Sequence, residues 1–511
     1  MHTPLSRAAL KLSVAAAGLV LALVAAETAA RFIDGYRLTT APLVQIRTAA
    51  AATHLTRTVL EHDLLAAIPI SAGVDRAWYD LDPQPVAAEP LSPERQARVD
   101  RYPSDIYGAL FEWNLNYLRE SLCAGITSGS LGILADFHYF APASGETKPT
   151  YRHLRNIWRP NWMVANSFGW RGPDVALNKA PDTIRLAFVG ASTTVSAYGF
   201  PFSHPEHIGY WLNRWARARG HRVQFEVINA GRTGIDSSSI SAIVRDEVAP
   251  VEPDMVVYYE GANQFWPGTV LDLPKGDKAL IAPTSTFPPP TWAERHSAIA
   301  RRLVTAGNLI AGRSGLEPVK PAFPARWAKG LNLSDPDLDG PGLPSNLPAI
   351  LADLESMRKA LAPSGGELAV SSFIWMVQDG MRLDPDRHQT LYHYLNGTYW
   401  PTSYAVMRQL ADLQNTVFRK YAARHHLEFF DVAADFPQNP DLFGDAIHMR
   451  PQGLRLLAWI YVQKLIPLIE ARIQSGALPR PMVTPRSEHP AFAVKTGLVS
   501  RDEILASCSK P

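Results

Sequence analysis

The sequence predicts an α/β fold built on a doubly wound parallel sheet, with an N-terminal helical extension and a proline-rich insertion. One observation is a series of short apolar runs, each closed by small residues and followed by a segment with helical periodicity. Such strand–helix units favour a parallel sheet with right-handed crossovers. Another is the length of 511 residues with 46% hydrophobic content, which suits one large domain plus appendages.

Three strand–helix units follow one another in the middle of the chain. Their apolar runs, at 184–189, 225–229 and 255–259, have the length and composition of buried strands in a parallel sheet. Apolar residues recur at helical spacing between these runs, and Gly220 is well placed to end the first helix.

The core is expected to resume after an insertion. Residues 265–345 are rich in proline and hold only a short helical piece around 292–303, so we interpret them as an insertion within the domain. Two more strands are predicted at 368–375 and 427–432, and the last helix of the core covers 451–468.

The chain begins with a segment that is typical of export. Arg7 and Lys11 precede the apolar run 12–26, which is short for a bilayer span and has the length of a signal-peptide core. Glu27 is a single polar interruption, after which the helical pattern continues. We favour an uncleaved, single-pass signal anchor in 1–33 over a cleaved signal peptide. Either interpretation places the rest of the protein outside the cytoplasm, in the periplasm or extracellular space.

The two flanks of the core carry weaker signals. Residues 34–165 show helical stretches at 44–67 and 109–122 without strand–helix alternation, and we expect them to form a cap or stalk region. The segment 476–511 is expected to be an irregular C-terminal tail.

Charge and cysteine content exclude several classes of function. Fifty Lys and Arg balance 48 Asp and Glu without a run of like charges, so we expect no nucleic-acid partner. Cys123 and Cys508 lack the spacing of a zinc or redox site, and we expect no metal or cofactor. A bridge between them is possible in an oxidising compartment. Two isolated cysteines are more often free thiols, and free thiols are what we expect.

Four clusters fall where ligands bind to open α/β sheets, beyond the carboxyl ends of the strands. They are Gly190-Ala191-Ser192, Gly231 to Gly234, Gly261-Ala262-Asn263, and Asp445 to His448. A serine at a strand-to-helix turn can expose its hydroxyl, and the amides at the helix start face developing negative charge. His448 can accept the serine proton while Asp445 holds the imidazole tautomer. The Gly234 amide and the Asn263 side chain can supply further donors.

The order Ser, Gly, Asn and then Asp-x-x-His resembles the SGNH (GDSL-like) hydrolase superfamily. The four segments read Phe-Val-Gly-Ala-Ser-Thr-Thr, Val-Ile-Asn-Ala-Gly-Arg-Thr-Gly, Tyr-Tyr-Glu-Gly-Ala-Asn and Asp-Ala-Ile-His. The resemblance covers residues 166–475 apart from the insertion, and implies a flavodoxin-like three-layer fold. It also implies a triad of Ser192, Asp445 and His448, with an oxyanion hole formed by the Ser192 amide, Gly234 and Asn263.

Two positions depart from the family pattern. Ala191 replaces the aspartate of the usual Gly-Asp-Ser, as in the Gly-x-Ser-Thr variant of membrane-anchored members. Gln264 stands where an acidic residue is common, which leaves the support of Asn263 open. Upstream, residues 166–172 resemble a motif of the same anchored members. Its Arg171 is a candidate for binding a substrate carboxylate or acyl group, and equally for fixing the loop.

The resemblance implies an exported serine esterase or O-acyltransferase. It would remove or transfer an acyl group, such as acetyl, on a cell-envelope glycan or related ester through an acyl-serine intermediate. An aromatic cluster can stack against a sugar ring or serve as core or lid: Tyr392, Tyr394, Tyr399 and Trp400. The acceptor, water or a sugar hydroxyl, and any protein partners stay open.

The alternative is a non-catalytic envelope scaffold that binds a glycan or a protein on the same fold. In that case Ser192 is a helix N-cap, a position where serine is favoured, and His448 with Asp445 is a hydrogen-bonded pair at a helix start.

Overall fold

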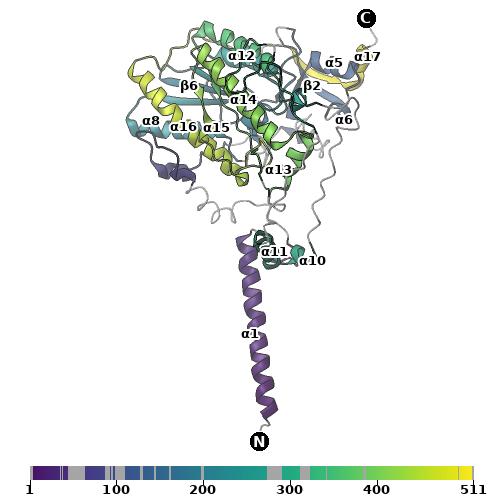
Figure 1. The fold of residues 1–511 in the computed structure, drawn as a ribbon. Coiled ribbons are helices and arrows are strands. Elements are labelled where there is room, and N and C mark those ends of the chain that lie inside the picture. The colour runs from purple at the N-terminus through teal and green to yellow at the C-terminus, as the bar shows by residue number, and fades with distance from the viewer. Residues whose placement is uncertain are drawn as a thin grey trace.

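The computed structural model of the chain describes residues 4–34, 36, 38–43, 64–86, 92–93, 96–97, 110–126, 130–142, 145–159, 163–196, 201–272, 291–310, 323–340, 342–381, 383, 387–492 and 494–508. Most of the helical stretch expected at 44–67 lies outside the described residues. Within them, a mixed α/β head stands above one long helix, α1 (Pro4–Ile33), at the N-terminus (Figure 1).

The head is built on a five-stranded sheet in which every neighbouring pair of strands is parallel. Its strands are β6 (Thr183–Gly190), β7 (Gln224–Asn229), β8 (Met255–Tyr259), β9 (Glu367–Ser371) and β10 (Phe429–Phe430). The spatial order is β10-β9-β8-β6-β7. The prediction of a mixed α/β core with a parallel sheet is confirmed, although β9 and β10 are shorter than expected.

Helices cover both faces of this sheet because successive side chains of a strand point to opposite sides. Leu186 and Phe188 of β6 pack in one apolar cluster, and Ala187 and Val189 pack in another. Side chains of α8 (His204–Arg219) and α16 (Pro451–Gln474) belong to the first cluster, and those of α9 (Ser237–Ile243) and α12 (Leu347–Leu361) belong to the second. The long helix α14 (Tyr404–Arg424) contributes its N-terminal half to the first cluster and its C-terminal half to the second.

Local signals fix where α8 begins and ends. Ser203 and Glu206 form a capping box at its start, and Gly220 ends it in the left-handed conformation (φ 72°), as predicted. The shorter helices of the head are α7 (Ser192–Val195), α13 (Gln389–His393) and α15 (Val432–Asp435).

A second sheet brings the two ends of the head together. It contains β1 (Phe111–Asn114), β2 (Asp136–Phe140), β3 (Tyr151–His153) and β11 (Thr496–Ser500), in the order β11-β2-β1-β3. The helices α5 (Leu115–Cys123), α6 (Ser130–Ile133) and α17 (Arg501–Ser507) accompany it. A separate hairpin of β4 (Ile157–Arg159) and β5 (Met163–Ala165) leads to the main sheet.

Two expectations about this region were wrong. The stretch 109–122, expected to be helical, contains strand β1 before α5. The expected irregular tail contains β11, which pairs with β2 from Thr496 to Ser500, and then α17. The backbone pairing of β11 depends on a strand more than 300 residues earlier, so its own short sequence does not indicate it.

The expectation of free thiols was also wrong. Cys123 at the end of α5 and Cys508 at the end of α17 form a disulfide across 385 residues, with their Cα atoms 5.4 Å apart. The bridge fixes α17 to α5 and so holds the C-terminal strand on the second sheet.

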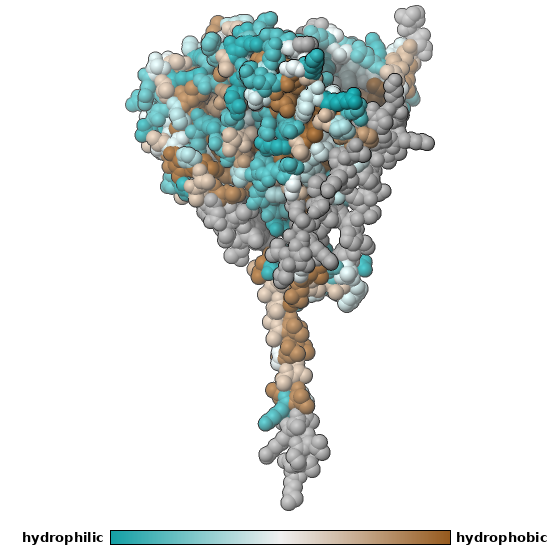
Figure 2. Space-filling model, in the orientation of Figure 1, coloured by the Kyte–Doolittle hydropathy of each residue, from teal (hydrophilic) through white to brown (hydrophobic). Residues whose placement is uncertain are grey.

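The helix α1 stands apart from the packed head. From Lys11 to Ile33 it is long and apolar enough to cross a membrane, and none of its most apolar window is buried, although a signal sequence would meet the same criteria. Figure 2 shows brown, apolar residues along α1 and a mixed surface on the head. Beside its C-terminal end lie two helices of the insertion, α10 (Trp292–His296) and α11 (Ala298–Ile310) (Figure 1).

The disulfide can be tested by peptide mapping. A non-reduced digest of the full chain is expected to contain one peptide pair joined through Cys123 and Cys508, because their positions allow a bridge without backbone movement. The Cys508→Ser variant is expected to expose one reactive thiol. Detection of two reactive thiols in the unreduced, denatured wild type would contradict the pairing.

Candidate active site

Ser192 lies at the turn between strand β6 and the one-turn helix α7. Ala191 is the N-cap of α7, and its side chain makes no capping hydrogen bond. The Thr194 hydroxyl donates to the Tyr259 carbonyl oxygen (2.8 Å), which fixes α7 to the end of β8. Gly190 is required here, because a Cβ atom would collide with that same carbonyl. The close packing of two strand ends therefore sets the position of Ser192.

Ser192, His448 and Asp445 form a continuous chain of hydrogen bonds. His448 Nε2 lies 2.8 Å from Ser192 Oγ, and His448 Nδ1 lies 2.7 Å from Asp445 Oδ2. An ionised carboxylate only accepts, so Nδ1 carries the hydrogen and Nε2 is left to accept the serine proton. This is the arrangement that base-assisted nucleophilic attack needs.

The loop before α16 holds the aspartate and histidine in this geometry. Asp445 Oδ1 accepts the backbone N–H groups of Ile447 (2.9 Å) and His448 (2.8 Å). The loop is closed by a bond from the Gly444 amide to the His448 carbonyl oxygen (2.8 Å). The relative positions of Asp445 and His448 are thus fixed by contacts within their own loop, independently of Ser192.

Hydrogen bonding keeps Asp445 ionised. Burial by itself raises the pKa of Asp445, but the His448 ring and the amides of His448 and Ile447 outweigh it and lower the pKa overall. A charged Asp445 stabilises the imidazolium that forms when His448 takes a proton.

The predicted oxyanion residues lie on two adjoining loops. Gly234, after β7, has a φ of 74°, a conformation that glycine adopts at low cost. Asn263, after β8, donates from Nδ2 to the Ile235 carbonyl oxygen (2.7 Å), beside Gly234. The structure therefore joins the second and third motifs. Gln264, which stands where the family pattern has an acidic residue, accepts the Ser237 amide at the start of α9 through its Oε1 (2.8 Å).

Glu260 supports this site and was missed by the sequence reasoning. It is only 3% exposed, and its Oε1 accepts the amides of Ala262 (2.7 Å) and Asn263 (2.9 Å). Burial raises the pKa of Glu260, although hydrogen bonds from the amides of Asn263, Ala262, Gly261 and Ala191 oppose the increase. The carboxylate therefore joins the Asn263 loop to the residue before Ser192. An acidic residue at the end of a buried strand was the available signal.

Arg171 contacts the end of α7 and the glutamate that caps α8. Its side chain is almost fully buried and donates from Nε to Glu206 (3.0 Å) and from Nη1 to the carbonyl oxygens of Val195 (3.0 Å) and Ser196. Glu206 also caps α8. These contacts join the end of α7 to the start of α8 and favour the loop-fixing interpretation over substrate binding.

The second sheet supports the Gly231 to Gly234 loop. The Tyr151 hydroxyl donates to the Thr233 carbonyl oxygen (2.5 Å), and Arg232 Nη1 donates to the Tyr151 carbonyl oxygen (3.0 Å). Lys148 forms an ion pair with Asp236 (2.6 Å), the N-cap of α9. The region expected to be a cap or stalk therefore contacts a loop of the site directly.

Part of the aromatic cluster lies beside the triad. Tyr394 and Tyr399 contact edge to face (5.4 Å between ring centroids), and Tyr399 packs against Trp375, which in turn packs against Phe265. Burial and the negative charge of Asp445 raise the pKa of Tyr394 to about 12, so its hydroxyl stays neutral. These rings connect the Asn263 loop with the Asp445 loop.

Comparisons with known proteins give only distant structural matches. No protein-family model and no curated protein sequence matches the chain. An acetylxylan esterase from Geobacillus stearothermophilus is 15% identical, with 55% of this chain and 93% of that one covered and a TM-score of 0.30. A GDSL-like lipase from Bacteroides thetaiotaomicron is 12% identical (56% and 89% covered, TM-score 0.27). Similarities of this size carry no functional argument, which depends on the side-chain geometry alone.

The lowered pKa of Asp445 predicts a pH-dependent stability. A carboxylate with a lower pKa in the folded state stabilises the fold above its unfolded pKa of about 3.9, and this stabilisation is lost as the pH falls through the folded pKa. We expect the melting temperature of wild type to exceed that of Asp445→Asn most above about pH 4, with a shrinking difference below it. Thermal unfolding measured across the acid range checks this. A difference that grows towards low pH would contradict it.

The role of Glu260 can be tested against a matched buried glutamate. We expect Glu260→Gln to lower kcat on an aryl acetate with little change in KM, because a carboxamide has one acceptor oxygen where the carboxylate has two, and its NH₂ group cannot accept any of the four amides that Glu260 binds. Glu252 is also buried and also accepts two amides, those of Val483 and Thr484, but it precedes β8 at the opposite edge of the sheet. Glu252→Gln is expected to keep kcat. Equal losses in both variants would indicate general destabilisation instead.

Proposed function

We propose that the chain is a serine esterase or O-acyltransferase of the SGNH type, with Ser192 as nucleophile, His448 as general base and Asp445 orienting the imidazole. The Ser192–His448–Asp445 hydrogen bonds of 2.8 and 2.7 Å carry the proposal. A serine that served as N-cap would accept amides of its own helix. Here Ala191 occupies the N-cap of α7 and the Ser192 hydroxyl contacts His448. This contact argues against the non-catalytic scaffold.

The topology of the sheet supports the same assignment. Numbered along the chain, its strands lie in the order 2-1-3-4-5, the order of flavodoxin-like, doubly wound folds. In such folds the ligand binds outside the carboxyl ends of the strands, which is where Ser192, Gly234 and Asn263 follow β6, β7 and β8.

The proposed reaction proceeds in two steps through an acyl-serine. Ser192 Oγ attacks the carbonyl carbon of the ester while His448 Nε2 takes the hydroxyl proton. The Ser192 and Gly234 amides and the Asn263 side chain would stabilise the negative oxygen. The bond to the leaving alcohol then breaks as His448 returns the proton to that alcohol. In the second step a water or sugar hydroxyl gives its proton to His448 and attacks the acyl carbon. The bond between that carbon and Ser192 Oγ then breaks as His448 returns the proton to Oγ, which regenerates the serine hydroxyl.

The surroundings of the triad favour a small acyl group on a carbohydrate. Ser192 is only 7% exposed, so a small acyl group such as acetyl reaches its hydroxyl more readily than a long acyl chain. Trp266, three residues after Asn263, is 58% exposed and presents a ring for stacking on a sugar. The insertion contributes to a cavity of about 440 Å³ lined by Thr269, Ser345 and Asn346 among others. Asn346 donates to the Gln264 carbonyl oxygen, so the cavity adjoins the Asn263 loop.

We also propose that α1 is an uncleaved, single-pass anchor with the head outside the cytoplasm. Glu27, near the end of α1, accepts two backbone amides of α11. The packed part of the chain therefore makes specific contacts with α1, which favours a helix that is retained. The Cys123–Cys508 disulfide supports an oxidising compartment, such as the periplasm or the extracellular space.

A fluorophosphonate probe tests the proposed chemistry. Wild type is expected to be labelled on Ser192 and to hydrolyse an aryl acetate, whereas Ser192→Ala and His448→Ala are expected to lose both properties. Ser196→Ala is a matched control, because the Ser196 hydroxyl bonds to the Thr193 carbonyl oxygen (3.0 Å) at the end of the same helix. It should keep the label. Equal low rates in wild type and in the Ser192 and His448 variants would favour the scaffold.

Asn263→Ala tests the oxyanion hole separately from the triad. We expect turnover to fall by about 10²–10³-fold, the usual effect of removing one oxyanion donor, while probe labelling of Ser192 shows that the serine is still in place. Steady-state kinetics on the aryl acetate give the comparison. An unchanged kcat would remove Asn263 from the mechanism.

A further inference from the structure

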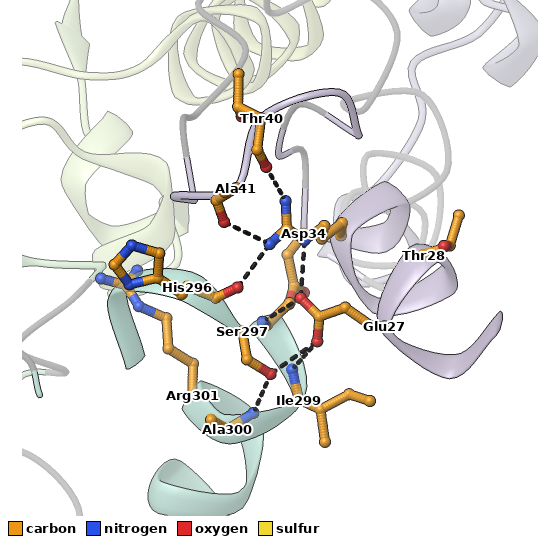
Figure 3. Close-up of polar contacts among 12 residues, drawn as sticks. Glu27, Thr28, Asp34, Thr40, Ala41, His296, Ser297, Ile299, Ala300 and Arg301 are labelled. Carbon is orange, nitrogen blue, oxygen red and sulfur yellow. Dashed lines mark hydrogen bonds and ion pairs between the residues drawn. The ribbon is translucent and has the colours of Figure 1, made fainter. Parts of the chain in front are cut away.

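The C-terminal end of α1 is bound to the start of α11 through Glu27. Its carboxylate accepts the Ser297 hydroxyl (2.8 Å) and the backbone amides of Ala298 (2.9 Å) and Ile299 (3.1 Å). Figure 3 shows the Glu27 side chain pointing from α1 to the first turn of α11. The first amides of a helix have no partner within the helix and attract negative charge. Glu27 therefore acts as a cap for α11 that is supplied by a helix 270 residues earlier.

Arg31 completes this junction one turn further along α1. Its Nε donates to Glu27 (2.8 Å), and its Nη2 donates to the carbonyl oxygens of Ala41 (2.9 Å) and His296 (2.6 Å). The Arg31 side chain is 10% exposed. One guanidinium thus joins α1, the turn that follows it and the end of α10.

Other contacts hold the α10–α11 hairpin (residues 292–310) against the segment after α1. Arg301 donates to the Tyr36 hydroxyl (2.7 Å), and Arg302 forms an ion pair with Asp34 (2.7 Å). The Leu43 amide donates to the Arg295 carbonyl oxygen (2.8 Å). Both helices of the hairpin are therefore attached to the point where the chain leaves α1.

The length of α1 places this junction at the surface of a bilayer. The apolar run from Leu12 to Ala26 is about 22 Å long at about 1.5 Å per residue, within a hydrocarbon layer of about 30 Å. Lys11 precedes this run, and its long side chain can extend to the headgroups on the far side. Glu27 directly follows the run. A charged side chain at that depth is costly unless it is paired, and the structure provides Arg31 and the start of α11 as partners. If α1 spans the membrane, the hairpin must lie at the boundary of the hydrocarbon layer.

The hairpin exposes apolar side chains that suit this position. Trp292 of α10 is 70% exposed, and Leu303 and Val304 of α11 are 67% and 43% exposed. Phe32 and Ile33, at the end of α1, are 58% and 52% exposed. Tryptophan and short amphipathic helices are typical of the membrane–water interface. Exposing these apolar side chains to water is unfavourable, whereas the headgroup layer of a bilayer can accommodate them.

We propose that the α10–α11 hairpin is a membrane-interface element, embedded in the headgroup layer on the side of the bilayer that carries the head. Its partner is the phospholipid surface. Trp292, Leu303 and Val304 enter the acyl boundary, and Glu27 and Arg31 hold the hairpin at that depth. The proposal rests on the anchor role of α1 and concerns a surface that the acyl-transfer chemistry does not use.

Spin labels on single cysteines test the depth of the hairpin. Cys123 and Cys508 are paired, and they are the two cysteines of the chain, so Leu303→Cys introduces one reactive thiol. In full-length protein in vesicles of phosphatidylethanolamine and phosphatidylglycerol, we expect this label to be relaxed by oxygen and protected from a water-soluble nickel chelate. Val483→Cys on the head is the matched control, since Val483 is 65% exposed. It is expected to be open to nickel.

A label at Leu19→Cys separates the hairpin from the anchor. If this α1 label is protected from nickel while the Leu303→Cys label is as open as the Val483→Cys label, the anchor stands and the hairpin proposal is overturned. If neither α1 nor the hairpin is protected, both proposals fail. Adding Glu27→Ala to Leu303→Cys is expected to raise nickel access while aryl acetate turnover is kept. Unchanged protection would overturn the role of Glu27.

Discussion

The whole candidate site depends on the carboxyl ends of parallel strands meeting at one edge of a sheet. This constraint lets Ser192, after strand β6, lie 2.8 Å from His448, which is 256 residues away. The helices on both faces bury the strands and fix their register. The loops that follow the carboxyl ends of the strands are therefore held in defined positions. The proposed acyl-transfer chemistry requires such precision, because a displacement of about 1 Å can cost about a hundredfold in rate.

Buried charges give the loops their rigidity. Glu260 and Arg171 lie on either side of the Ser192 turn, the first accepting backbone amides and the second donating to backbone carbonyls. Burying a charge without partners is expensive, so each must be fully hydrogen-bonded to be tolerated. Because these two buried side chains need hydrogen bonds, the backbone amides and carbonyl groups around Ser192 are held in the positions where they can form them.

Segments far apart in the sequence complete the molecule outside the central sheet. Strand β11 and the Cys123–Cys508 disulfide fix the C-terminus to the second sheet, whose Tyr151 contacts the loop that carries Gly234. In a similar way Glu27 and Arg31 fix α1 to the insertion. The C-terminal end therefore supports the sheet that contacts the candidate site, whereas the N-terminal helix is held by the insertion.

The sequence by itself determined the strands β6, β7 and β8 and the residues that follow them, because apolar runs closed by small residues depend on local composition. The resemblance of its motifs also predicted the hydrogen-bonded chain of Ser192, His448 and Asp445, while Gly234 and Asn263 as oxyanion donors stay a prediction. Only the tertiary structure decided the pairing of β11, the disulfide, the burial of Glu260 and Arg171, and the contact of Glu27 with α11. Each of these is an interaction between distant residues, and its free energy arises only when the fold excludes water from both partners.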